Sequence, residues 1–362
     1  MKKILLITMQ DYNNIGNRLQ NYALTKVLEK YGAEVTNLDN GYTKSPSIKT
    51  RLKNQIKRVI GDFGSEYYRD SYKAFQNQPL RREANIRFTR SNMPSMIRTT
   101  CAGAFEKNWS AYDLSITGSD QVWHNWRHVE KELPYYYLEF MPAEKRVSYA
   151  ASFGFEELPE EDRAEHRKGL QGMHAISCRE SSGCTLIKKE TGRDAVRVLD
   201  PTLLLSANDW REVETSIPGD LHVEKGKYAF LYFLGQVPEK YQSFIDKVLM
   251  KRNIKVLDFL DFKNEAIAKC GAGEFLSLID NAAYILTDSF HCTVFSTLFQ
   301  KEFTVFRRRG KGYEKMFGRI EDLLQSTGHT DRAFEPLEED PDAVPFDQLY
   351  TDSRNFLEEV LK

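Results

Sequence analysis

Short apolar runs alternate with amphipathic stretches along most of this chain. Ten runs of four to seven residues are nearly continuous in apolar character, which is typical of strands buried in parallel sheets. They lie at 3–8, 33–38, 112–117, 146–151, 175–178, 196–199, 228–234, 255–259, 284–287 and 303–306. After the first run, Leu19, Tyr22 and Val27 recur at helical spacing until Gly32, a residue suited to a helix end. The alternation predicts an α/β fold.

The order of the runs predicts two Rossmann-like, doubly wound domains that face a cleft. The first domain is expected at 1–205, with a basic helical insertion at about 44–98 that is not part of the sheet. The second is expected at 206–340 and includes helices near 238–251, 274–281 and 312–326. A last helix within 341–362 is expected to pack back on the first domain.

Composition narrows the class of protein. The 362 residues are 41% apolar and 28% charged with a net charge of -1, which is ordinary for a globular protein and disfavours nucleic-acid binding. The segment 44–98 is an exception, since thirteen Lys and Arg against four acids give it a charge of +9. It is either a solvated helical face or a patch for an anionic glycan, a lipid-linked diphosphate or a membrane surface.

The cysteines and apolar stretches indicate a compartment. The five cysteines show no metal-ligand spacing and are interpreted as reduced thiols, so no metal is expected. No stretch approaches the ~18 apolar residues that cross a bilayer. The sequence predicts a cytoplasmic protein, with peripheral contact at the inner face of the membrane through 44–98 left open.

The most informative candidate site follows the run at 284–287. Asp288 and Ser289 are good helix N-caps, so His291 is expected in the first turn of a helix just past a strand end. Ligands bind at that edge of open α/β sheets, and free N–H groups at helix starts attract anions. His291 is therefore a candidate for acid–base catalysis on a phosphorylated or carboxylated substrate. The alternative is a capping or core histidine.

Two loops of the first domain are expected to reach the same cleft. Asn14 and Asn17 flank a glycine at a helix start, where they bind a ligand or simply form a turn. Ser119, Asp120, Gln121 and Trp123 follow the strand at 112–117, with Trp123 suited to stacking on a sugar ring. The alternative for this second loop is helix capping by Ser119 or Asp120, with Trp123 in the core.

Cations and a glycine complete the candidate set. Arg179 stands at a strand end, where its planar guanidinium suits a carboxylate or phosphate, or pairs with Glu180 at the surface. Gly235 opens a helix in the second domain where a phosphate is expected to fit. The cationic loop at 307–311 and Arg319 are expected to neutralise an anion or to be solvated.

The motifs, in order and spacing, resemble the polysaccharide pyruvyl transferase family. They are NIGN at 14–17, GSDQVW at 118–123, SYAASFG at 148–154, RE at 179–180, DPTLL at 200–204 and TDSFH at 287–291 followed by TVFS at 293–296. The resemblance implies a fold similar to the two-Rossmann glycosyltransferase-B architecture. It also implies a transferase that moves pyruvate from phosphoenolpyruvate, a co-substrate, onto two sugar hydroxyls as a ketal, with no cofactor.

The resemblance also implies roles for individual residues. His291 matches the active-site histidine and Arg179 the arginine that holds the donor, while Asp120 is the candidate that activates the acceptor hydroxyl. Relatives often carry arginine where this chain has Ser289, and glycine where it has Cys292. We therefore expect Arg307, Arg308 or Arg319 to supply the missing donor-binding charge. A nucleotide-sugar glycosyltransferase and a non-catalytic glycan-binding protein are the alternatives.

Overall fold

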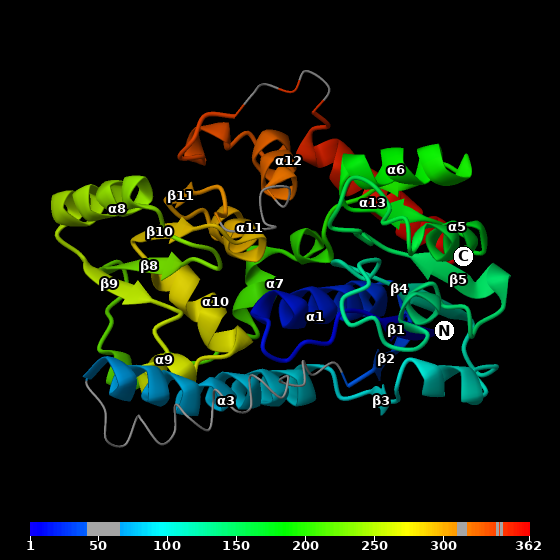
Figure 1. Cartoon of the computed structure of the whole chain (residues 1–362), viewed down its shortest axis with the longest axis horizontal. Helices are drawn as coiled ribbons and strands as arrows, with labels where there is room; N and C mark the ends of the chain where they lie inside the picture. Colours follow the sequence, from blue (N-terminus) through cyan, green and yellow to red (C-terminus); the bar gives the residue numbers. More distant parts are fainter. Residues whose placement is uncertain (42–65, 310–316, 338–339, 341–342) are drawn as a thin grey trace.

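The computed structural model describes residues 1–41, 66–309, 317–337, 340 and 343–362 of the chain. It is an α/β structure with two main parallel sheets (Figure 1). The first sheet has the order β3-β2-β1-β4-β5 and the second has the order β11-β10-β8-β9. In both sheets the strand order reverses beside the first strand, so each is doubly wound as predicted.

All ten predicted strands are present, although several are shorter than the apolar runs, and an eleventh strand at 96–98 was not predicted. The strands are β1 (Lys3–Ile7), β2 (Glu34–Asp39), β3 (Met96–Arg98), β4 (Leu114–Thr117), β5 (Arg146–Ser148), β6 (Ser177–Cys178), β7 (Val196–Arg197), β8 (Tyr228–Tyr232), β9 (Lys255–Asp258), β10 (Tyr284–Thr287) and β11 (Phe303–Val305). β6 and β7 form a small parallel pair that continues the first sheet through bridges from Val147 to Ala175 and from Ala151 to Cys178.

Helices connect the strands and cover the sheets. They are α1 (Ile15–Lys30), α3 (Glu66–Asn92), α4 (Glu132–Tyr136), α5 (Arg163–Gln171), α6 (Ser181–Thr191), α7 (Ala207–Arg211), α8 (Glu239–Arg252), α9 (Glu265–Ala268), α10 (Ala272–Asn281), α11 (Phe290–Leu298), α12 (Gly318–Ser326) and α13 (Phe346–Val360). α1 begins where the side chain of Asn14 accepts a hydrogen bond from the Asn17 amide, and it ends before Gly32, whose φ is +80°.

One apolar core joins the two halves of the molecule. Tyr22 on α1 packs against Trp210 on α7, and Trp210 packs edge-on against Phe295 on α11, with ring centroids 5.4 and 4.8 Å apart. All three rings are buried, and they belong to one cluster that draws on both sheets. The packing therefore holds the strand ends of the two sheets at a defined separation.

The prediction that the basic segment is not part of the sheet was wrong, whereas its helical character is confirmed by α3. Residues 96–98 are the edge strand β3, which pairs with β2, because their register continues the first sheet. α3 contacts α1 of the first half and α9 and α10 of the second (Figure 1). Its Arg81 is only 4% exposed and donates to the carbonyl oxygens of Phe259, Ile267 and Cys270, so it joins the halves. Residues 44–65 lie outside the described part.

The last helix contacts the first half of the chain. α13 packs against β7, and the hydroxyl of Ser353 accepts a hydrogen bond of 2.8 Å from the Leu199 amide. Among the helices of the described ranges, none has the length together with the apolar character that a membrane crossing demands.

Candidate functional site

The predicted loops lie at the places where the strand order of each sheet reverses. β1 and β4 are neighbours in the first sheet, and the segments that follow them carry Asn17, in the first turn of α1, and Asp120. β8 and β10 are neighbours in the second sheet, and the segments that follow them carry Gly235 and His291, in the first turn of α11. These are the positions where ligands bind in doubly wound sheets.

His291 is the second residue of α11, as the sequence predicted. Ser289 is the N-cap, and its hydroxyl accepts a hydrogen bond of 3.5 Å from the Cys292 amide. The imidazole lies against the start of α1, since a Cβ on Gly16 would fall 2.2 Å from the His291 Nδ1 atom. The absence of a side chain at Gly16 is what lets the histidine of the second half reach the first.

The charged residues around His291 have opposing effects on the pKa of its imidazole. Burial lowers the pKa of its imidazole below the ordinary value, Asp200 and Asp120 raise it in part, and Arg179 and Arg319 lower it again. The Nε2 atom is buried and has no hydrogen-bond partner among the residues that the structure describes. Because buried polar atoms are nearly always paired, this nitrogen is a candidate for direct contact with a substrate.

Arg179 is held by three carboxylates. Its Nε donates to Glu180 over 2.9 Å, its Nη1 donates to Asp200 over 2.9 Å, and its Nη2 lies 3.5 Å from Asp120. Burial alone would lower the pKa of Arg179, but these carboxylates raise it above its usual value. The side chain is 4% exposed, so the predicted surface pair with Glu180 is instead a buried ion-pair network.

Asp120 faces both cations and an amide. Asn17 donates to its Oδ2 over 2.6 Å, and Arg319 from α12 lies 3.7 Å from its Oδ1. Burial raises the pKa of Asp120, but Arg179, His291 and Arg319 together bring it below the usual value. The carboxylate is therefore ionised at neutral pH.

Phe290 places the two arginines near each other. Its ring lies 4.9 Å from the guanidinium carbon of Arg179 and 5.8 Å from that of Arg319. Burial and the like charge of Arg179 lower the pKa of Arg319 to about 10, which still leaves it protonated at neutral pH. We call Asp120, Arg179, Asp200, His291 and Arg319 the central cluster.

Other predicted residues have structural partners. Ser119 donates from its hydroxyl to Asp200 and from its amide to Gln20, so it supports the central cluster. Asn14 is exposed and caps α1. Gln121 is 7% exposed and lines a cleft beside the cluster.

The prediction that Trp123 stacks on a sugar was wrong for this conformation. Trp123 is fully buried, and its ring stacks on Tyr137 at 5.4 Å and packs on Phe153 at 4.9 Å. The indole is therefore a core residue with aromatic neighbours, which was the alternative that the sequence left open.

The backbone amide of Gly235 already has a hydrogen-bond partner within the protein. The amides of Leu234 and Gly235 donate to the two carboxylate oxygens of Asp288 over 2.7 and 2.8 Å. Arg308 donates to the Asp288 carbonyl over 3.1 Å, and its Nε lies 3.6 Å from the carboxylate. A phosphate at Gly235, as the sequence suggested, would have to displace this carboxylate.

The arginines of the predicted cationic loop differ in position. Arg307 pairs with Glu321 and Glu335, and Arg309 pairs with Glu335 and donates to the Tyr241 hydroxyl. Arg319 alone of the three candidates for the compensating charge contacts Asp120 among the described residues. Positions 310 and 311 lie outside the described part.

A family model described as polysaccharide pyruvyl transferase matches residues 14–309, which is most of the chain. The chain belongs to this family. No curated protein matches the sequence. The protein is therefore a transferase, and its family suggests a glycan as the acceptor.

Solved structures with a related arrangement have low sequence identity. A putative UDP-N-acetylglucosamine 2-epimerase from Listeria monocytogenes is 10% identical, with a TM-score of 0.49 over 99% of this chain and 88% of that one. The UDP-GlcNAc 2-epimerase from Methanocaldococcus jannaschii is 11% identical, with a TM-score of 0.48 over 100% and 92%. The E. coli heptosyltransferase WaaC is 11% identical, with a TM-score of 0.38 over 99% of both chains.

Asp200, a member of the transferase's central cluster, and Gly16, which lies against His291, were not among the predicted site residues. Asp200 accepts from Arg179, from Ser119 and, through its other oxygen, twice from Thr202. Its position directly after the predicted strand at 196–199 was a usable signal. Gly16 gave a weaker signal, because only the folded chain brings it to His291.

Proposed function

We propose that this protein transfers the pyruvyl carbons of phosphoenolpyruvate to two hydroxyls of a glycan, forming a pyruvate ketal and inorganic phosphate. The single observation that carries the proposal is the environment of the His291 imidazole. Its buried Nε2, which has no hydrogen-bond partner in the described part of the chain, lies in a cluster with two arginines and two ionised carboxylates at the strand ends of both sheets. Family membership supports the general reaction class.

Arg179 and Arg319 are suited to the donor. Phosphoenolpyruvate carries a carboxylate and a phosphate, and arginine binds both through paired N–H groups. Both guanidinium groups lie over Phe290, next to His291. Arg319 thereby provides a second cation although Ser289 stands where relatives often carry arginine.

The reaction requires two hydroxyl additions and one proton transfer to carbon. In the proposed order, His291 protonates the methylene carbon of the donor while the first sugar hydroxyl bonds to the adjacent carbon and gives its proton to Asp120. The C–O bond to phosphate then breaks, and the phosphate leaves with the electron pair. The second hydroxyl bonds to the same carbon and gives its proton to the departing phosphate, and Asp120 returns its proton to His291. The methylene has become a methyl group.

The test is release of phosphate from phosphoenolpyruvate in the presence of a panel of glycan acceptors. We expect His291→Ala to lower turnover by ~10²–10⁴-fold, the usual loss when a proton-transfer group is removed. His174→Ala is the matched control, because His174 is exposed and lies on a different loop. Thermal unfolding of both variants separates lost chemistry from lost folding. Turnover of His291→Ala within a few-fold of the unaltered protein would refute the assignment.

The two alternatives predict different results in ligand binding and in the phosphate-release assay. A nucleotide-sugar glycosyltransferase would be stabilised by a nucleoside diphosphate in a thermal-shift measurement and not by phosphoenolpyruvate. A glycan-binding protein would bind oligosaccharide and release no phosphate with any acceptor. Phosphate release that needs both phosphoenolpyruvate and a glycan excludes both.

A further inference from the structure

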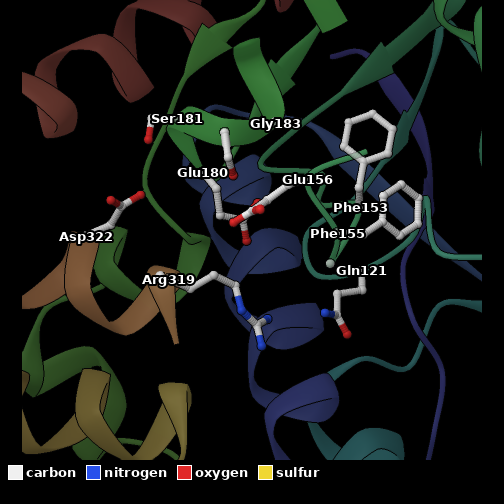
Figure 2. A pocket seen from close by; sticks show the side chains of 12 residues that line it. Gln121, Phe153, Phe155, Glu156, Glu180, Ser181, Gly183, Arg319 and Asp322 are labelled. Carbon is white, nitrogen blue, oxygen red and sulfur yellow. The ribbon is translucent and has the colours of Figure 1, made fainter. Parts of the chain in front are cut away.

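A cleft opens beside the central cluster, between the start of α6 and the start of α12. Its cavity volume is about 160 Å³. One wall carries Phe153 and Phe155, and the others carry Gln121, Glu156, Glu180 and Arg319 (Figure 2). Lining residues thus come from both halves of the molecule.

The chemistry of the walls disfavours an anion as the occupant. Among the described lining residues, Glu156, Glu180 and Asp322 contribute three carboxylates, and Arg319 is the one arginine. Carboxylates accept hydrogen bonds from hydroxyl groups, and an aromatic ring offers an apolar face. Phe155 is partly exposed, and its ring lies 5.7 Å from that of Phe153. Apolar faces with hydroxyl acceptors around them fit a neutral sugar ring.

Gln121 is a second and independent observation. It is 7% exposed, and its Nε2 has no hydrogen-bond partner within the described ranges. Figure 2 shows its amide and the guanidinium of Arg319 pointing toward one another in the cleft. Leaving a buried amide unpaired is costly, and a ligand oxygen between these two donors would satisfy both.

The cleft is continuous with the central cluster. Arg319 lines the cleft and lies 3.7 Å from Asp120, while Glu180 lines it and accepts from Arg179. A ring held in the cleft therefore has its hydroxyls close to the proposed base and the proposed donor site.

We propose that this cleft binds one sugar unit of the glycan acceptor and directs its hydroxyls toward Asp120. The role of that sugar as an acceptor rests on the proposed function, whereas its binding is measured without turnover. Phe155 provides the apolar face, Glu156 and Glu180 accept from hydroxyls, and Gln121 and Arg319 donate to ring or hydroxyl oxygens.

The test uses methyl glycosides of galactose, glucose, mannose and N-acetylglucosamine as probes, with saturation-transfer NMR as the readout. We expect at least one glycoside to bind, and we expect Phe155→Ala and Glu156→Gln each to weaken it by roughly three- to tenfold. Affinity for phosphoenolpyruvate should stay within twofold. Glu157→Gln is the matched control, because Glu157 is an exposed neighbour that does not line the cleft.

Several outcomes overturn the proposal. One is the absence of saturation transfer to every glycoside in the panel, and another is unchanged glycoside affinity in both variants. A third is tighter binding of phosphoenolpyruvate or inorganic phosphate by Glu156→Gln, because removal of a negative charge favours an anion. Since Glu156 is exposed, its replacement tests the cleft even if Phe155→Ala fails to fold.

Turnover measurements separate this proposal from the proposed function. If phosphate is released and Phe155→Ala leaves the acceptor KM unchanged, the cleft assignment alone fails. If glycosides bind in a way that depends on Phe155 and no acceptor yields phosphate, the proposed function fails and the sugar site remains.

Discussion

Two groups of arginines lie at the strand ends of this molecule, and they differ in what surrounds them. Arg179 and Arg319 of the central cluster have side chains that are 4% and 13% exposed, whereas Arg307 and Arg309 of the neighbouring loop are 33% and 42% exposed. The loop arginines pair with Glu321 and Glu335. Arg179 instead binds acids from three separate segments of the chain.

The difference shows which cations are suited to a substrate. An exposed ion pair contributes ~0–1 kcal/mol, so the loop pairs are expected to affect little beyond local order. A buried arginine among carboxylates is costly to assemble and strongly destabilising to disrupt. The central cluster also contains the buried Nε2 atom of His291, which has no hydrogen-bond partner among the described residues.

The largest effect is expected from Arg179→Gln. The change leaves Asp120, Asp200 and Glu180 buried without their shared cation, and breaking a buried pair costs about 3–5 kcal/mol. Loss of transition-state electrostatics should also lower turnover by ~10²-fold or more. Chemical denaturation and phosphate release measure the two effects. A loss of stability below about 1 kcal/mol would show that the ion pairs of Arg179 contribute no more than those of the loop arginines.

The second-largest effect is expected from Gly16→Ala, which changes the packing of His291 in the central cluster. Its Cβ would lie 2.2 Å from the imidazole of His291, so the ring must move, and overpacking of this kind costs about 1–3 kcal/mol. We expect turnover to fall by roughly tenfold or more, since small displacements of catalytic groups are expensive. Gly219→Ala is the control, because no atom lies within 4 Å of the added Cβ. Equal turnover in the two variants would contradict the His291 assignment.

Arg319→Gln should affect donor binding more than folding. Its ion pair with Asp120 spans 3.7 Å and its burial lowers its pKa, so its removal should change Tm by only a few degrees. Loss of one charged contact to the donor should raise the KM for phosphoenolpyruvate by roughly tenfold. If the KM for phosphoenolpyruvate stays constant while the KM for the acceptor rises, Arg319 contacts the sugar and not the donor.

The pH dependence tests the charges around His291. Because burial lowers the pKa of His291, its ring takes up a proton below pH 6.5 in the folded protein and near that value when unfolded. Stability is therefore retained above pH 6.5 and lost as the pH falls below it, and His291→Gln should reduce this loss.

The pH profile of kcat/KM gives a second test. In Asp120→Asn, removal of a carboxylate that raises the pKa of His291 should move the His291 limb of this profile to lower pH. An unchanged limb would refute the coupling.

The smallest effects are expected from Arg307→Gln and Arg309→Gln. Each removes a partly exposed ion pair, so the free energy of unfolding should change by ~0–1 kcal/mol and turnover should stay within twofold. A tenfold loss of turnover in either variant would show that the loop binds the donor after all.

Much of the fold was accessible from the sequence because parallel strands are buried on both faces. Their continuous apolar runs marked ten strands and the loops after them. The edge strand β3 was missed, since an exposed edge strand of three residues carries no such run. Helices as short as α4, α7 and α9 were missed for a similar reason, because four or five residues show little periodicity.

The sequence by itself determined that His291, Asp120 and Arg179 follow strand ends, because local apolar pattern and capping residues place them there. Only the tertiary structure decided the partners of these residues. Asp200 binds Arg179, Asp288 occupies the amide of Gly235, Trp123 lies in the core and Arg319 reaches Asp120. Ion pairs and packing between residues far apart in the chain depend on how the sheets and helices are held together, and no local pattern encodes that arrangement.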